Sequence, residues 1–252
     1  MKERVQLLDI AVDVFATKDA SDLTKRYMEE EGSRVVYFVN SGTLLLLQSN
    51  PDWKTAVEAS ELILPATTSV NASIDKVLGH RRDSFFMESY INSILDYAIE
   101  MGYELLLLTE DEGTFTSIQE NIHEKRPVLT LSGLYLTEKE ESLEHIVNEI
   151  NSVAPDILLV ALQEKKQLAL LQEYRNLMNA GIILFTGDTL YNKAVTEAEV
   201  PESIRKLKLD NLYKWFQTDG RVKTFWANLA MKFQLRLHKK EEKSEKTDKT
   251  GM

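Results

Sequence analysis

Short apolar runs recur along the chain and alternate with longer stretches in which apolar residues follow a helical spacing. The runs are rich in leucine and β-branched residues, which is typical of buried strands, and they predict strands at residues 35–39, 61–65, 104–109, 127–132, 156–162 and 181–186. The stretches between them predict helices at residues 43–60, 87–101, 114–124, 138–151 and 166–179. This alternation predicts an α/β fold, Rossmann-like, with a mostly parallel sheet and helices on both faces.

A sheet of this kind binds ligands at the carboxyl ends of its strands, because loops and helix N-termini meet there. The segments that follow the predicted strands are residues 40–41, 65–69, 109–113, 132–134, 162–167 and 186–188. We therefore expect the functional residues of this chain to lie in these segments.

The distribution of charge divides the chain of 252 residues near Pro201. Residues 1–202 hold 17 basic and 34 acidic side chains, whereas residues 203–240 hold ten basic and two acidic ones. We predict an α/β domain at residues 1–200, a basic, aromatic, helical appendage at 201–240 and a disordered tail at 241–252.

Apolar side chains at helical spacing run through the appendage, opposite its basic residues. Such a helix suits the interface of an anionic membrane, and the expected contact residues are Lys206, Lys208, Lys214, Trp215, Arg221, Lys223, Trp226, Lys232 and Arg236. Membrane or partner contact is our first interpretation and packing within the chain is the second. Nucleic acid is a distant third, because the acidic body would repel a polyanion.

Several classes of chemistry lack candidate residues in this sequence. There is no cysteine, and the four histidines show no HxH or HExxH spacing, so we expect no metal and no cofactor. The motifs GxGxxG, GxxxxGK[ST] and GxSxG are also absent. No apolar run approaches the roughly 20 residues of a membrane span, and the amino terminus does not have the form of a signal peptide. We expect a cytoplasmic protein that is peripheral at the inner face of the cell membrane.

Three segments follow a recognisable order of strands and polar turns. Residues 36–79 contain a strand that ends in Asn40, a helix, an NPDW turn and a strand that ends in Pro65. DILLVALQEKKQ follows at 156–167, and LDNLYKW lies at 209–215. In these segments the chain resembles the WecG/TagA/CpsF glycosyltransferases.

The resemblance implies transfer of an N-acetylhexosamine from a UDP-sugar to a sugar carried on undecaprenyl diphosphate, as in teichoic acid, enterobacterial common antigen or capsule synthesis. It requires no metal, and it implies substrate contacts at Asn40, Thr67, Thr68 and Gln167. Asn40 suits a helix cap equally well, because it precedes Ser41 and Gly42. Gln167 also suits a plain helix start.

The family's candidate base is a carboxylate directly after the Leu-Pro pair, and this chain has Ala66 there. A methyl group accepts no proton, and threonine hydroxyls are not bases at neutral pH. Phe85 stands where the family has an arginine, and Glu110 and Gln163 stand where it has glycines. These changes predict a filled, less positive cleft with weak or absent UDP-sugar binding.

Three functions follow as hypotheses. The first is a catalytically impaired member that binds another component of a polysaccharide assembly machine, such as another glycosyltransferase or a second copy of itself. The second is an active transferase with a relocated base at Asp75, Asp188 or a neighbouring carboxylate. The third is an interaction module unrelated to glycans.

Overall fold

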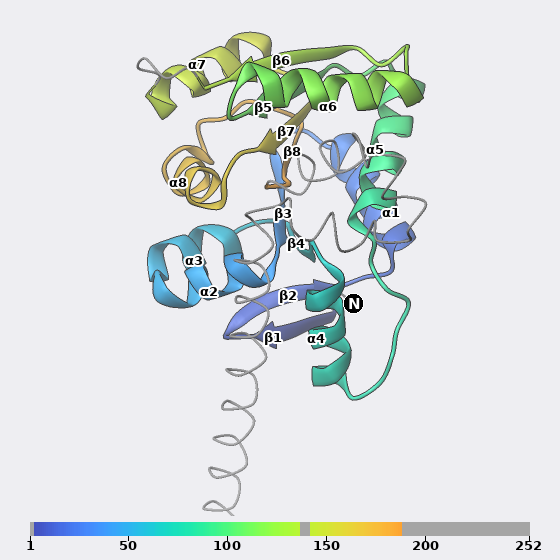
Figure 1. The fold of residues 1–252 in the computed structure, drawn as a ribbon, viewed down its shortest axis with the longest axis vertical. Coiled ribbons are helices and arrows are strands. Elements are labelled where there is room, and N and C mark those ends of the chain that lie inside the picture. The colour runs from blue at the N-terminus through green and yellow to red at the C-terminus, as the bar shows by residue number, and fades with distance from the viewer. Residues whose placement is uncertain (1–2, 137–141, 188–252) are drawn as a thin grey trace, which may run out of the picture.

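The computed structural model describes residues 3–136 and 142–187, and its centre is a six-stranded parallel sheet (Figure 1). The strand order is β4-β3-β8-β7-β5-β6. The strands are β3 (Arg34–Val39), β4 (Leu62–Pro65), β5 (Leu105–Thr109), β6 (Leu131–Tyr135), β7 (Ile157–Ala161) and β8 (Ile182–Phe185). The predicted α/β, Rossmann-like fold is therefore confirmed, whereas the predicted appendage at 201–240 and the tail at 241–252 lie outside the described residues.

Both faces of the sheet are buried, because the central strands are apolar at nearly every position, the exceptions being Arg34 and Thr109 at strand ends. Val35, Tyr37 and Val39 point to one face, with the apolar core beneath α2, α3, α7 and α8, and Val36 and Phe38 point to the other, beneath α1, α5 and α6. The helices are α1 (Thr17–Met28), α2 (Ser41–Ser49), α3 (Pro51–Glu58), α4 (Thr68–Leu78), α5 (Met87–Met101), α6 (Glu112–Lys125), α7 (Leu143–Val153) and α8 (Glu164–Tyr174).

The helix predicted at residues 43–60 is two helices, α2 and α3. Asn50 separates them: its side chain accepts hydrogen bonds from the backbone nitrogens of Asp52 and Trp53, and Pro51 occupies the first position of α3. Proline is favoured there because its missing N–H would be unpaired in any case. The helix predicted at 166–179 ends at Tyr174, and Leu177 is exposed.

The strand predicted at 127–132 is also displaced, because β6 begins only at Leu131. Residues 127–130 form a turn after α6, and Val128 in this turn is 73% exposed. Gly133, placed in a loop by the sequence, lies inside β6. A Cβ at this glycine would come within 2.3 Å of the Phe115 ring, so the glycine permits close packing of α6 on the edge of the sheet.

The sequence did not predict α1, α4 or the amino-terminal hairpin. The hairpin joins β1 (Glu3–Leu7) to β2 (Ile10–Val14) through the two-residue turn of Leu8 and Asp9, both with positive φ. Positive φ at both turn residues matches the right-handed twist of the strands but is usually reserved for Asn and Gly. Leu8 is nonetheless buried, so its packing contributes to holding the turn.

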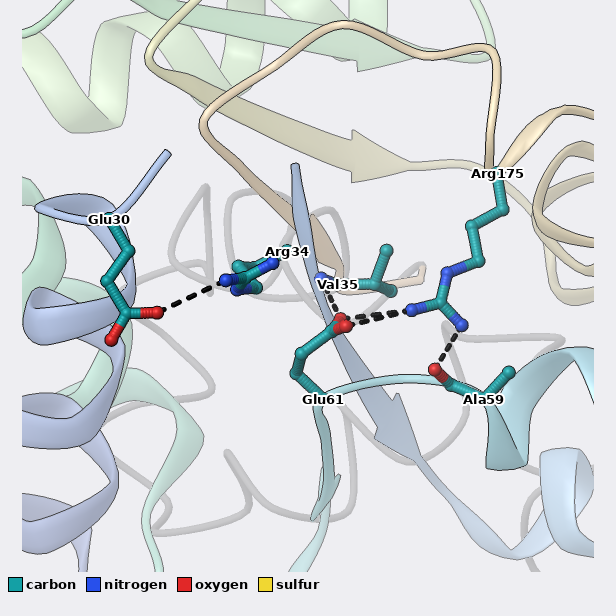
Figure 2. A network of polar contacts seen from close by, with 6 residues as sticks. All are labelled: Glu30, Arg34, Val35, Ala59, Glu61 and Arg175. Atoms are coloured by element: carbon teal, nitrogen blue, oxygen red, sulfur yellow. Dashed lines mark hydrogen bonds and ion pairs between the residues drawn. The ribbon is translucent and has the colours of Figure 1, made fainter. Parts of the chain in front are cut away.

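The amino edge of the sheet is held by a polar network (Figure 2). Glu61 accepts a 2.7 Å hydrogen bond from the backbone nitrogen of Val35 and pairs with Arg175 at 3.0 Å. Arg175 also donates to the carbonyl oxygen of Ala59. The end of α8 is thereby tied to the start of β3 and β4, which leaves the opposite, carboxyl edge to hold a site.

A buried carboxylate joins the hairpin to β4. Asp13 is fully buried; one oxygen accepts from Arg4 Nε at 2.7 Å and the other from the backbone nitrogen of Ile63 at 2.8 Å. Because the Ile63 N–H belongs to the outer edge of β4, Asp13 satisfies an edge group that would otherwise be buried and unpaired.

We predict that Asp13→Ala lowers the free energy of unfolding by about 2–4 kcal/mol, because the Ile63 N–H and the Arg4 guanidinium both lose their hydrogen-bond acceptor. Urea denaturation measures the effect. Asp22→Ala, at an exposed position of α1, is the control and should stay within about 0.5 kcal/mol of the parent. Equal losses in the two variants would contradict this role of Asp13.

Candidate functional site at the carboxyl edge of the sheet

Asn40 caps the helix that follows β3. Its side-chain oxygen accepts from the backbone nitrogen of Thr43 at 2.9 Å, and the Thr43 hydroxyl in turn accepts from the backbone nitrogen of Asn40 at 3.4 Å. This reciprocal pair is a capping box. Of the two roles that the sequence allowed for Asn40, helix capping is therefore realised, and substrate contact stays a prediction.

A carboxylate from another element lies over the start of α2. Glu164, the first residue of α8, accepts a 3.1 Å hydrogen bond from the Thr43 hydroxyl. A Cβ on Gly42 would come within 3.1 Å of Glu164 Oε2 and of Asn40 Oδ1. Helix N-termini favour negative charge because their N–H groups are unpaired, so Glu164 occupies a position that suits an anion.

The start of α8 is served in the same way by Glu110, which follows β5. Its Oε1 accepts a 2.6 Å hydrogen bond from the backbone nitrogen of Gln163, and its Oε2 pairs with Lys166. The side chain of Gln163 provides no cap for α8. Glu110 therefore supplies the acceptor that this helix N-terminus lacks.

The loop after β4 holds Ala66, Thr67 and Thr68. The Thr67 hydroxyl accepts from the backbone nitrogen of Val70 at 3.4 Å and lies 2.9 Å from the Ser69 hydroxyl, so Thr67 caps α4. Thr68 is exposed at the first position of that helix, and Ala66 is half-buried. No carboxylate belongs to these three residues, so none of them can act as a base at neutral pH.

Gln167 is buried in α8 and spans to the end of β8. Its side-chain oxygen accepts a 3.1 Å hydrogen bond from the backbone nitrogen of Gly187, which has φ of +62°. Burial raises the pKa of the neighbouring Tyr37 phenol well above its ordinary value; Glu164 adds to the shift, and Gln167 opposes it. Tyr37 is therefore a neutral phenol at physiological pH.

Phe85 lies on the opposite face of the sheet, in the apolar core beneath α5 and α6. Its side chain is 1% exposed, and its ring lies 6.1 Å from that of Phe38 and 5.5 Å from that of Tyr90. Asn71 donates to the Phe85 carbonyl oxygen at 2.8 Å, and Arg82 donates to Asn71 Oδ1 at 2.7 Å. The segment that carries Phe85 is thus fixed, and a buried ring stands at the position where the resemblance predicts a cation.

A cavity of about 270 Å³ opens beside Ala66, between α5 and α6. Its deep walls are apolar and come from both helices and the sheet: Phe85, Met87, Ile91, Leu95, Ile118, Ile122 and Leu159. Thr67, Thr68 and Glu88 lie at one end, and Lys125 and Arg126 also line it. The structure therefore puts an apolar cavity on the α5 and α6 side of Ala66.

The structure brings Asn40 and Ser41 toward the α4 start, since the Ser41 and Ser69 hydroxyls lie 3.5 Å apart. The structure also places Glu164 in this group of polar residues, which the sequence did not single out. An acidic residue in the first helical turn after a buried strand could have indicated it. The predicted contact residues from Lys206 to Arg236 lie outside the described residues. Within the described ranges, no three His, Asp or Glu side chains are grouped closely enough to hold a metal ion.

We predict that Asn40→Ala lowers the free energy of unfolding by about 1 kcal/mol, because the α2 cap is lost. Urea denaturation is the measurement. Asn40→Ser is the matched control: serine can also cap, so most of the stability should remain. If the two variants were equally destabilised, capping would not explain the role of Asn40.

The sequence was compared with known families and proteins. The sequence model described as "Glycosyl transferase WecG/TagA/CpsF family" matches residues 5–246. No curated protein matches the chain at a significant level. Since the family match spans most of the chain of 252 residues, the chain belongs to the WecG/TagA/CpsF glycosyltransferase family.

Proposed function

We propose that this chain is a catalytically impaired member of its family that acts in cell-surface polysaccharide synthesis by binding another component at the membrane. The observation that carries the proposal is Ala66 at the end of β4, where the family places a carboxylate base. The hydroxyl of the adjacent Thr67 is engaged in capping α4. An inverting transfer needs a group that takes the proton of the acceptor hydroxyl, and this loop offers none.

The acidic groups at the carboxyl edge support the same proposal. Glu164 lies over the start of α2, and Glu110 lies at the start of α8. Because Glu110 pairs with Lys166, the repulsion comes chiefly from Glu164: a unit negative charge about 4 Å from its carboxylate would be repelled by about 4 kcal/mol at an effective dielectric constant of 20. That corresponds to roughly a thousandfold loss of affinity, which a UDP-sugar would have to overcome at a site that has also lost an arginine at Phe85.

The membrane part of the proposal rests on the basic appendage. In the described residues, no helix is both long and apolar enough to span a bilayer. Contact through the basic and aromatic residues between Lys206 and Arg236 would instead be peripheral. The partner would be another glycosyltransferase or a second copy of this chain, assembled beside an anionic surface.

One observation favours the alternative, an active transferase with a relocated base. Glu164 lies at the carboxyl edge, and its carboxylate and the Asn40 side chain both adjoin Gly42. It is better placed than Asp75, which lies within α4 and pairs with Arg82 at 3.4 Å; Asp188 lies outside the described residues. Glu164 could accept a proton there, with an N-acetylhexosamine as the transferred group.

Titration of the full chain with UDP and UDP-N-acetylhexosamines separates the two functions. We predict no saturable binding below about 1 mM, the upper end of usual substrate affinities, because Asn40 and Thr67 already cap α2 and α4 and the Glu164 carboxylate lies over the start of α2. Isothermal titration calorimetry is the measurement, with an assay of sugar transfer to a polyprenyl-diphosphate acceptor beside it.

Glu164→Gln is the informative variant in the transfer assay, and Glu173→Gln, exposed on the same helix, is its control. For an impaired protein, all three forms show no transfer. Transfer by the parent that falls about 10²- to 10⁴-fold in Glu164→Gln alone would overturn the proposal and establish the relocated base.

Sedimentation with vesicles tests the membrane contact. We predict that replacing Lys214, Lys223 and Lys232 by Gln weakens binding to anionic vesicles about a hundredfold, since each lysine contributes on the order of 1 kcal/mol. A matched triple variant at Lys18, Lys54 and Lys165, which lie in the α/β domain, should bind like the parent. Equal effects of the two triple variants would refute a specific role for the appendage.

A further inference from the structure

We propose that the cavity between α5 and α6 binds a small amphipathic carboxylate, a molecule with an unbranched or aromatic apolar body and one anionic head. The proposal goes beyond the proposed function and does not depend on it, because the walls of the cavity are the same whether or not this chain transfers a sugar. It rests on the volume of the cavity, the apolar character of its walls and the charge at one end.

The volume fits a ligand body of limited size. The cavity of about 270 Å³ is nearly twice the roughly 150 Å³ engineered cavity that takes up one benzene ring. It also approaches the lower limit of about 300 Å³ for small-molecule sites. A body of one ring with a short chain, or a chain of about eight carbons, matches this space.

The walls favour an apolar body. Met87, Ile91 and Leu95 succeed one another along α5, and Ile118 and Ile122 face them from α6. All five are less than 9% exposed, and Leu159 of β7 is also part of the lining. Transfer of apolar surface from water into such walls is favourable, so apolar contact supplies the main part of the affinity.

The two ends of the cavity differ in charge. Glu88 lies in the first turn of α5, beside the end marked by Thr67 and Thr68. Two turns further along α5 lies Asp96. It accepts a 2.6 Å hydrogen bond from Arg126, which follows α6, and neutralises the charge of that arginine. Lys125, exposed beside that pair, leaves a net positive charge at this end.

This asymmetry selects the head group. Two helical turns separate the two ends by about 11 Å, which is the length of an extended chain of about eight carbons. A carboxylate at the Lys125 end gains from the cation, and its body then points toward Ala66. A cationic head is repelled by Lys125 at this end and could approach only the Glu88 end, where Glu88 already interacts with another group of the chain.

The test is calorimetric titration of the full chain with sodium octanoate, with octan-1-ol and octylammonium as probes of equal chain length. We expect octanoate to saturate below about 1 mM. The other two probes should bind more weakly, octylammonium weakest. Lys125→Gln should weaken octanoate threefold to fivefold, the scale of an exposed ion pair, and leave octan-1-ol unchanged. Lys18→Gln on α1 is the charge-matched control and should leave all three probes unchanged.

Two variants fill the cavity from different elements and guard against a folding defect in either. Ala66→Leu narrows the end near β4, and Ile118→Phe narrows the wall from α6; binding of octanoate should be lost in whichever variant keeps a cooperative thermal unfolding transition. Failure of octanoate to saturate, equal affinity for octanoate and octylammonium, or unchanged binding in a folded cavity-filled variant would overturn the proposal. The titration with UDP-sugars has its own outcome, so either proposal can fail without the other.

Discussion

The carboxyl edge of the sheet is governed by one constraint, the unpaired N–H groups at the start of each helix that follows a strand. In a parallel sheet these starts gather at one edge, and each must find an acceptor. An enzyme that binds a diphosphate can leave some of them for its ligand. Here the chain supplies one acceptor of its own at each of five such starts: Asn40, Thr67, Asp111 and Ser142 cap α2, α4, α6 and α7, and Glu110 serves α8.

The same contacts also hold the elements in place and set the charge of the edge. Glu110, which follows β5, accepts a hydrogen bond from the backbone nitrogen of Gln163 at the start of α8. Glu164, the first residue of α8, accepts one from the Thr43 hydroxyl of α2. Three strands are thereby linked in the order β5, β7 and β3 through carboxylates. The arrangement stabilises the fold and places the Glu164 carboxylate over the start of α2, where a helix N-terminus favours negative charge. At Asp111, hydrogen bonds from Thr114 lower the pKa and keep that carboxylate charged.

The fold could be read from the sequence where burial is uniform. The runs 35–39, 104–109 and 156–162 are apolar at nearly every position, and each coincides with a central strand within a residue or so. The hairpin was missed because its strands are short and its turn at Leu8 and Asp9 lacks glycine. The importance of Ala66 could be recognised only through the resemblance, because in the family the residue directly after the Leu-Pro pair is the candidate base. The contact between Glu164 and Thr43 could not be found, because these residues are 121 positions apart and meet only through the strand order.

The contacts on the two sides of Ala66 explain how the fold is held without a charged side chain at position 66. On the side of α2 and α8, every polar contact described above is made between groups of this chain, and none requires a charge at position 66. On the side of α5 and α6, Phe85 packs with Phe38 and Tyr90 where the family has an arginine. A buried arginine without a partner carboxylate would cost several kcal/mol. An uncharged residue at position 66 is therefore compatible with an uncharged residue at position 85. The edge therefore has carboxylates on one side of Ala66 and an apolar cavity on the other.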